Sequence, residues 1–263
     1  MEHRKSSRNW VSFDLRYVLC VHSTQASNRL LQRGEKFLRL PAHGKSSRHF
    51  FKRAMSIFTA SLVEFFGLPR AGKTTAVEAL AHRLARDGYN VAVVRERASV
   101  CPIRNKMGPL FNYWTAISQL KEYVEACDRG VDLLIADRGI LDAAVWLNYK
   151  NESGEFDEEV ADFTRLLDNR FMNKRTLLGL WFTADIEVVL RREFERRITP
   201  TPGTVMNRRV LAGYADAYSR MKGDLEARVP ITEIDTTNLD ISSTIKAVYG
   251  TVATALQSEP RQL

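Results

Sequence analysis

The segment GLPRAGKTT, residues 67–75, constrains the fold of this chain more than any other. It follows residues 61–66, SLVEFF, a short apolar and β-rich run typical of a buried strand. It leads into residues 74–88, whose apolar side chains recur at helical spacing until Gly88, where a helix would end. The sequence therefore predicts a glycine-rich turn between a buried strand and a helix.

The spacing Gly67-x4-Gly72-Lys73-Thr74 is that of a P-loop, and the strand–turn–helix context is the one this motif requires. Glycines let the main chain turn its N–H groups towards phosphates, and the positive end of the helix favours anions. Lys73 can reach the β- and γ-phosphates, and the hydroxyl of Thr74 can ligate Mg²⁺. We therefore predict a site for ATP and Mg²⁺. The predicted phosphate-binding residues are Gly67, Arg70, Ala71, Gly72, Lys73, Thr74 and Thr75.

Two further apolar runs end in charged residues. Residues 91–94, VAVV, precede the sequence RER, and residues 132–136, DLLIA, precede the sequence DRG. The carboxyl ends of parallel strands open onto the ligand crevice of a sheet. We therefore expect Glu96, Asp137 and Arg138 to face the same cleft as the P-loop.

The roles expected for these residues follow from phosphoryl transfer, which needs positioning and charge neutralisation. Asp137 is expected to hold the metal together with Thr74, and Arg138 to hold the acceptor or the transferred phosphoryl group. Glu96 could accept the proton of a nucleoside hydroxyl. The alternative for Asp137 and Arg138 is a surface ion pair. Cations near Glu96 would instead suit an acceptor that already carries a phosphate; they are Arg95, Arg97, Arg104 and Lys106.

An arginine-rich helix is predicted within residues 185–203, DIEVVLRREFERRITPTPG. Arg192 and Arg196 are four residues apart and share a helix face, and the TPTPG run then breaks the helix. This pattern favours a lid that closes over ATP and brings guanidinium groups to the developing charge. The alternative is an exposed helix whose arginines pair with Glu193 and Glu195.

Together these motifs resemble the thymidylate kinase and deoxynucleoside kinase group of P-loop kinases. The matching sequences, in order, are GLPRAGKTT, RERA, DRG and VVLRREFERR, and the resemblance covers roughly residues 57–256. It implies an ATP-dependent kinase and places residues 231–238, ITEIDTTN, near the adenine. The chain departs from thymidylate kinases at Trp114 and Thr115, which stand where those enzymes carry the Asp-Arg pair that binds the acceptor nucleotide.

Alternating strand and helix patterns predict an α/β fold, a doubly wound parallel five-stranded sheet with helices on both faces, as in P-loop NTPases. The expected strands are 61–66, 91–95, 132–136, 177–183 and 231–235, and the expected helices include 110–129, 156–172 and 207–227. On the first of these helices, one of Phe111, Tyr113 and Trp114 is expected to stack on an acceptor base, and Gln119 could bond its edge.

The charge of the chain is unevenly distributed. Residues 1–54 carry 12 Lys+Arg and 3 Asp+Glu, a net of +9, whereas residues 55–263 carry 27 basic and 28 acidic residues, a net of −1. A nucleic-acid partner is therefore not favoured for the body, in which we place a P-loop kinase-like domain. The basic segment could be a targeting peptide, a basic arm, or, as we favour, upstream sequence before a start at Met55.

Three separate cysteines without a C-x-x-C pair indicate a reducing compartment, and no run of 18 apolar residues predicts a membrane span. We therefore expect a cytoplasmic protein, with a homodimer left open. The expected function is transfer of the γ-phosphoryl group of Mg-ATP to a small nucleotide or nucleoside acceptor. The alternative is an ATP-binding regulatory or partner-binding module without kinase activity. A third hypothesis, less favoured by the sequence, is a kinase that acts on a nucleic-acid end or on another small alcohol.

Overall fold

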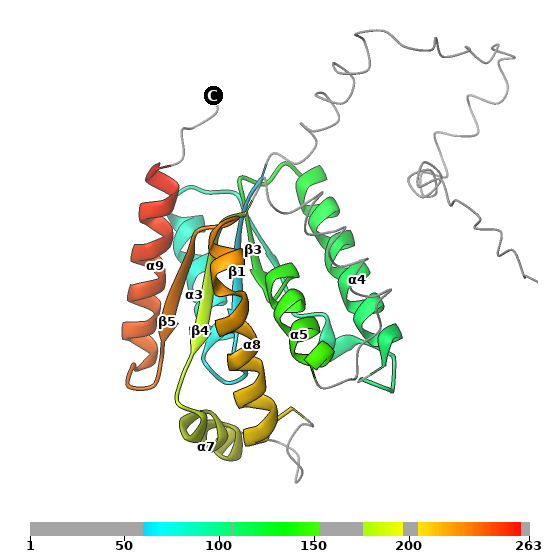
Figure 1. Cartoon of the computed structure of the whole chain (residues 1–263). Helices are drawn as coiled ribbons and strands as arrows, with labels where there is room; N and C mark the ends of the chain where they lie inside the picture. Colours follow the sequence, from blue (N-terminus) through cyan, green and yellow to red (C-terminus); the bar gives the residue numbers. More distant parts are fainter. Residues whose placement is uncertain (1–59, 107, 153–175, 197–204, 259–263) are drawn as a thin grey trace, which may run out of the picture. The chain divides into compact units, whose positions relative to one another are not determined.

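A computed structural model of the chain describes residues 60–106, 108–152, 176–196 and 205–258. These residues form a five-stranded sheet covered by helices on both faces (Figure 1). The strands are β1 (Ser61–Gly67), β2 (Val91–Val94), β3 (Leu133–Asp137), β4 (Thr176–Thr183) and β5 (Ile231–Asp235). All five agree with the strands that the apolar runs predict. The basic segment 1–54 and the expected helix 156–172 lie outside the described residues and stay predictions.

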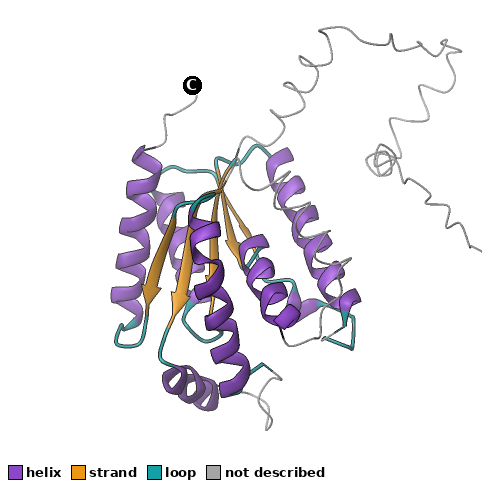
Figure 2. Ribbon diagram, viewed as in Figure 1, coloured by secondary structure: helices purple, strands orange, loops and turns teal. Residues whose placement is uncertain are grey.

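The strand order is β2-β3-β1-β4-β5, and every neighbouring pair is parallel. All the arrows in Figure 2 therefore point towards the same edge of the sheet. The chain builds β2 and β3 on one side of β1 and then β4 and β5 on the other. In open α/β sheets the ligand crevice lies where the order reverses in this way, at the carboxyl ends of the strands. The residues that follow β1 are those of the P-loop.

Two helices cover one face of the sheet and two cover the other, while α4 packs beside α5 and β2 (Figure 1). The first pair are α3 (Lys73–Arg86) and α9 (Ile241–Ser258), and the second pair are α5 (Ile140–Glu152) and α8 (Arg208–Glu226). Helix α4 spans Pro109–Asp128, and α7 spans Ile186–Arg196 and packs against α8. The two-faced arrangement confirms the predicted fold class.

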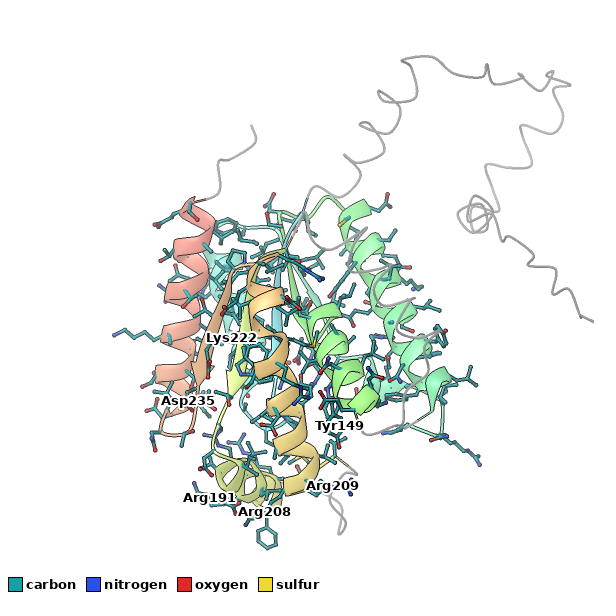
Figure 3. The ribbon with its side chains drawn as sticks, in the orientation of Figure 1. Tyr149, Arg191, Arg208, Arg209, Lys222 and Asp235 are labelled. Carbon is teal, nitrogen blue, oxygen red and sulfur yellow. The ribbon has the colours of Figure 1, made fainter. Side chains whose placement is uncertain are left out.

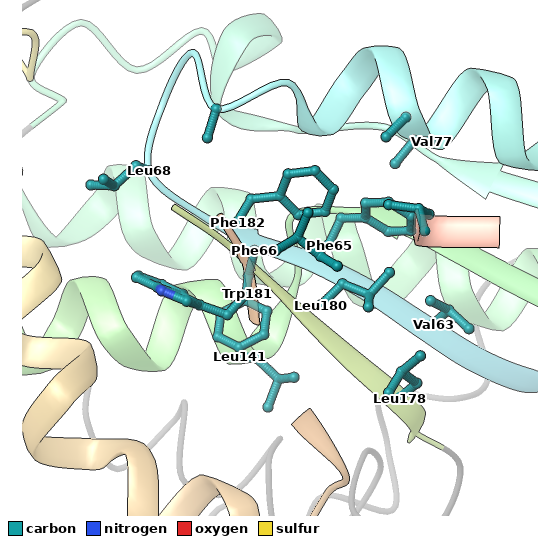
Figure 4. Packing of buried hydrophobic residues seen from close by; sticks show 14 of the residues in the cluster. Val63, Phe65, Phe66, Leu68, Val77, Leu141, Leu178, Leu180, Trp181 and Phe182 are labelled. Carbon is teal, nitrogen blue, oxygen red and sulfur yellow. The ribbon is translucent and has the colours of Figure 1, made fainter. Parts of the chain in front are cut away.

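The core lies on both sides of the central strands, which explains why their sequences are continuously apolar. Phe65 of β1 stacks on Phe182 of β4 with ring centroids 5.5 Å apart (Figure 4). Trp181 of β4 stacks on Tyr218 of α8 with ring centroids 3.7 Å apart. Glu64 is the exception within β1, because its carboxyl group is fully buried. Its partners belong to the candidate active site.

Candidate active site

The P-loop turn depends on two glycines in the left-handed region of backbone space. Gly67 has φ 121°, and a Cβ there would lie 2.1 Å from the carbonyl oxygen of Phe182. Gly72 has φ 94° immediately before α3 begins at Lys73. Residues with a Cβ are strained at such angles. The turn therefore brings β1 close to β4 and aims the start of α3 at the end of the sheet.

Lys73 is buried at the start of α3, and its ammonium group donates to the carbonyl oxygens of Gly67, at 3.0 Å, and Leu68, at 2.6 Å. Burial, together with the positive charge of Arg138, lowers the pKa of Lys73 to about 7. A group with such a pKa gains its full charge when an anion approaches.

Thr74 and Asp137 meet where β1 and β3 end. The Thr74 hydroxyl donates to Oδ2 of Asp137 at 2.6 Å. Asp137 is 4% exposed, and its Oδ1 has no hydrogen-bond partner among the described residues. Mg²⁺ is held in such sites by one or two protein oxygens together with substrate phosphates and waters. An orphaned carboxylate oxygen beside a hydroxyl fits that ion. Within the described ranges no group of three His, Cys, Asp or Glu side chains could hold a metal by itself.

Arg138 joins the ends of two strands to helix α5. Its backbone has φ 65°, and its N–H donates to the Phe65 carbonyl oxygen at 2.8 Å. Its guanidinium pairs with Asp142 at 2.8 Å and with Glu96, which follows β2, at 3.2 Å. Burial alone would lower the pKa of Arg138, but these carboxylates raise it above its ordinary value. The guanidinium is therefore a fixed positive charge beside the P-loop.

Asp142 connects four parts of the site, a role that the sequence did not reveal. One of its oxygens accepts from the Gly67 N–H at 3.3 Å and from the Tyr214 hydroxyl at 2.6 Å, while both oxygens accept from Arg138. The Asp142 N–H in turn donates to buried Glu64 at 3.0 Å. Burial, with the nearby Asp142 charge adding to it, raises the pKa of Glu64 to about 8. The P-loop, β3, α5 and α8 are thus held in one buried polar network.

Helix α7 contacts the P-loop through two side chains. Arg192 donates to the carbonyl oxygen of Arg70 in the P-loop at 3.4 Å. It also donates to the carbonyl oxygen of Thr236, after β5, at 2.6 Å and to the Thr236 hydroxyl at 3.0 Å. Glu193 pairs with Arg70 of the P-loop at 2.5 Å. Glu193 therefore does not pair with an arginine of its own helix, as the alternative to a lid would have it, but reaches across to the P-loop. The predicted break at 200–203 lies outside the described residues.

A cavity of about 650 Å³ begins at the P-loop and continues between α4 and α5. Among the predicted site residues, those that line it are Arg70, Gly72, Lys73, Thr74, Thr75, Glu96, Asp137, Arg138, Arg192 and Arg196. Gly67 is buried at the end of β1 and does not line the cavity, and Ala71 lines a neighbouring hollow. The predicted residues therefore come together around one space.

Of the nearby cations, Arg97 and Lys106 line this cavity, whereas Arg95 and Arg104 do not. Arg95 instead pairs with Glu78 on an exposed surface. Only two of the four cations in this stretch therefore face the cavity.

The part of the cavity between α4 and α5 has aromatic walls. Of the three aromatic candidates on α4, only Phe111 lines the cavity. Trp146 and Tyr149 of α5 line it as well, and Tyr149 lies between α5 and α8 (Figure 3). Gln119 also lines it, although its amide is engaged by the Arg138 carbonyl oxygen at 3.0 Å.

A neighbouring hollow of about 480 Å³ lies between the P-loop and the start of α9. It is lined by Arg192 and Arg196 of α7, by Thr236 after β5, and by residues 239–242. The buried Thr236 hydroxyl also donates to the carbonyl oxygen of Ala71 at 3.1 Å. The stretch for which the resemblance implied contact with the adenine therefore lies directly beside the P-loop.

Comparison with solved structures identifies the fold. The structure matches deoxyadenosine kinase from M. mycoides with dCMP and dCDP bound, with a TM-score of 0.58 and 13% sequence identity over 73% of this chain and 99% of that one. The same enzyme with bound dATP gives 0.57 and 14% over the same shares of the two chains. Thymidylate kinase from Candida albicans gives 0.53 and 15% over 76% and 94%. The chain has the fold of the P-loop nucleoside and nucleotide kinases.

Comparisons with protein families and with curated proteins give less information about this chain. A family model described as methylmalonyl-CoA mutase-associated GTPase MeaB matches residues 36–101, which include the P-loop but are less than half of the chain. No curated protein matches the sequence. No helix in the described part of the chain is long and apolar enough to cross a membrane. The P-loop fold thus implies binding of a nucleotide with Mg²⁺ and leaves open whether that nucleotide is ATP or GTP.

Proposed function

We propose that this protein is a phosphotransferase that moves the γ-phosphoryl group of Mg-ATP to a nucleoside monophosphate or nucleoside. The observation that carries this proposal is the shape of the main cavity. It runs without a break from Lys73 and Thr74, past Arg138, to the aromatic walls between α4 and α5. A nucleotide hydrolase needs only the first part of this space, whereas a kinase also needs room for a second substrate.

The residues at the P-loop are suited to hold the donor phosphates. Lys73 neutralises the β- and γ-phosphates, and main-chain N–H groups after Gly67 surround them. Thr74 and Asp137 would hold Mg²⁺, which neutralises charge on the phosphate oxygens during transfer. Arg192 and Arg196 line both the cavity and the hollow next to it, where the donor base is expected.

Arg138 and Glu96 are placed to act on the acceptor. Arg138 is held by two carboxylates through Nε and Nη1, which leaves its Nη2 group to donate to an acceptor phosphate in the cavity that it lines. Glu96 can accept the proton of an acceptor hydroxyl, because its carboxylate lines the same cavity. Arg97 and Lys106 add further positive charge. We rank the monophosphate above the nucleoside because these cations suit a phosphate.

A transfer screen tests the proposal directly. Mg-ATP and Mg-GTP are each incubated with the common nucleosides and their monophosphates, and the products are separated. We expect transfer from ATP to at least one acceptor. Lys73→Ala should reduce this transfer by a factor of about 10³ or more while the fold persists, because the variant loses charge stabilisation in the transition state.

Arg95→Ala is the matched control, since Arg95 lies outside the cavity and pairs with exposed Glu78. It should leave the transfer rate unchanged. Full activity in Lys73→Ala would refute the assignment of the donor site.

A second candidate is a nucleotide-binding regulatory or partner-binding module, either for ATP or for GTP. The match of residues 36–101 to a GTPase family favours it, as does the replacement of the acceptor-binding Asp-Arg pair by Trp114 and Thr115. Tight binding of ATP or GTP without transfer to any acceptor in the same screen would support this candidate over the kinase.

A further inference from the structure

Gly213 lies on α8 at the point where this helix meets Tyr149 of α5 (Figure 3). A Cβ atom at Gly213 would lie 2.5 Å from Cε2 and 2.9 Å from Cδ2 of the Tyr149 ring. Carbon atoms pack favourably at about 3.5–4.0 Å, so the ring occupies space that a side chain at position 213 would fill. Glycine is a poor helix former, and this contact gives its presence inside α8 a structural reason.

The Tyr149 ring forms part of the wall of the main cavity at the end away from the phosphates. Tyr149 lines the cavity. Asp142 contacts the P-loop at the start of α5, and Tyr149 is seven residues further on, about 10 Å along the helix axis. In the proposed function this end of the cavity receives the acceptor base.

Trp146 restricts where the Tyr149 ring can move. It packs edge-to-face against Tyr149 with ring centroids 5.9 Å apart. It also packs on Tyr214 of α8 at 4.3 Å, and Tyr214 is fully buried and bonded to Asp142. Because Trp146 is held in this way, a Tyr149 ring pushed away from α8 would move into the cavity.

The α4 side of the same cavity carries small side chains. Thr115 and Ala116 of α4 line it. The cavity is therefore relieved from two sides, by short side chains on α4 and by a missing side chain behind Tyr149. Both features widen the space that a base can occupy.

We propose that Gly213 determines how large an acceptor base the cavity admits, and that the space it leaves behind Tyr149 opens the cavity to purines. This inference rests on the proposed kinase function and specifies its acceptor. Gly213 acts as a positioning residue, because it contacts Tyr149 and does not line the cavity. A side chain in its place would push the ring inwards by about 1 Å and would exclude a two-ring base before a one-ring base.

Purine and pyrimidine deoxynucleoside monophosphates test the proposal on the full-length protein. Transfer from Mg-ATP is measured for the monophosphates of deoxyadenosine, deoxyguanosine, thymidine and deoxycytidine. We expect the wild type to accept at least one purine. Gly213→Ala should lower the purine-to-pyrimidine ratio of kcat/KM by at least about 10-fold, chiefly through a higher KM for the purine, because the displaced ring takes up binding space. An unchanged ratio, or a wild type that accepts only pyrimidines, would overturn the proposal.

A second change, at Tyr149, separates this role from a general effect on the fold. A variant that was only destabilised would lose transfer to both kinds of base equally. Tyr149→Ala removes the ring that would be displaced, so adding Gly213→Ala to it should leave the ratio unchanged. The same loss of ratio in that double variant would contradict the assignment.

Gly223→Ala is the matched control. Gly223 also lies within α8, but a Cβ there would meet no atom within 4 Å. This variant should keep the wild-type ratio, and a loss equal to that of Gly213→Ala would show that the effect does not come from Tyr149.

The wild-type measurement needs no variant, and the double variant contains no clash, so the test remains decisive if Gly213→Ala alone fails to fold. If no monophosphate or nucleoside accepts phosphate, the proposed function fails and this inference with it. Transfer to purines and pyrimidines in a ratio that Gly213→Ala does not change would leave the kinase proposal standing and remove only the inference.

Discussion

At the scale of single residues, the charge of Lys73 is the property on which nucleotide binding depends most. Its pKa is lowered to about 7 by burial and then by Arg138, so at pH 8 most molecules carry a neutral Lys73. A bound phosphate chain stabilises the charged form and raises this pKa again. Nucleotide binding should therefore be linked to uptake of a proton.

We expect uptake of close to one proton when ATP or ADP binds at pH 8, and an affinity that weakens by up to about tenfold per pH unit above that pKa. The sign follows because the bound state holds more protons than the free state between the two pKa values. Calorimetry in two buffers with different ionisation enthalpies measures the uptake. Lys73→Arg keeps its charge throughout this range and should show none; equal uptake in that variant would assign the proton to another group.

The sequence was most informative about the residues whose chemistry is local. The glycines, Lys73 and Thr74 are neighbours in the chain, so their spacing alone predicts the phosphate-binding turn. Glu64 and Asp142 are 78 residues apart, and their contact is created only by packing β1 against the start of α5. A carboxyl group in the middle of an apolar strand was the available indication that Glu64 had a buried partner.

At the scale of elements, the buried network around Asp142 determines how β1, β3, α5 and α8 meet. Asp142 accepts from Gly67 at the end of β1, from Arg138 immediately after β3, and from Tyr214 of α8. Removing one partner of a buried ion pair leaves the other charge uncompensated, at a cost of about 3–5 kcal/mol. The network therefore affects both stability and the placement of Arg138.

Asp142→Asn should lower the free energy of unfolding by about 3 kcal/mol, because an amide cannot balance the Arg138 charge. Tyr214→Phe removes a single hydrogen bond to the same oxygen and should cost about 1 kcal/mol. Urea denaturation at pH 7 measures both values. A loss below about 1 kcal/mol in Asp142→Asn would show that Arg138 finds other partners.

Element boundaries were predictable where apolar runs were nearly continuous, as in β1 and β4. The orientation of α4 was harder to predict from the sequence. Three aromatic residues near its start could each have faced the acceptor, and packing against α5 leaves only Phe111 on the cavity wall. The aromatic residues of α5 were missed for the same reason, since sequence spacing does not show which helix lies opposite.

At the scale of the whole molecule, the described residues form one sheet with the site at its carboxyl edge, as the alternating pattern of strands and helices predicts. The order β2-β3-β1-β4-β5 did not follow from that pattern, because parallel crossovers fix the handedness of a connection but not which strand it reaches. The order places β1 centrally, with the P-loop between the cavity that we propose holds the acceptor and the hollow expected to hold the donor base.

The central claim is that one continuous space holds a donor phosphate chain and an acceptor nucleoside together. The most direct measurement is the affinity of a two-ended ligand, in which adenosine and a deoxynucleoside are joined through a chain of five phosphates. We predict that it binds at least about 100-fold more tightly than ATP alone, because the second half binds without a further loss of translational freedom. An affinity equal to that of ATP would mean that no acceptor site adjoins the P-loop and would contradict the account.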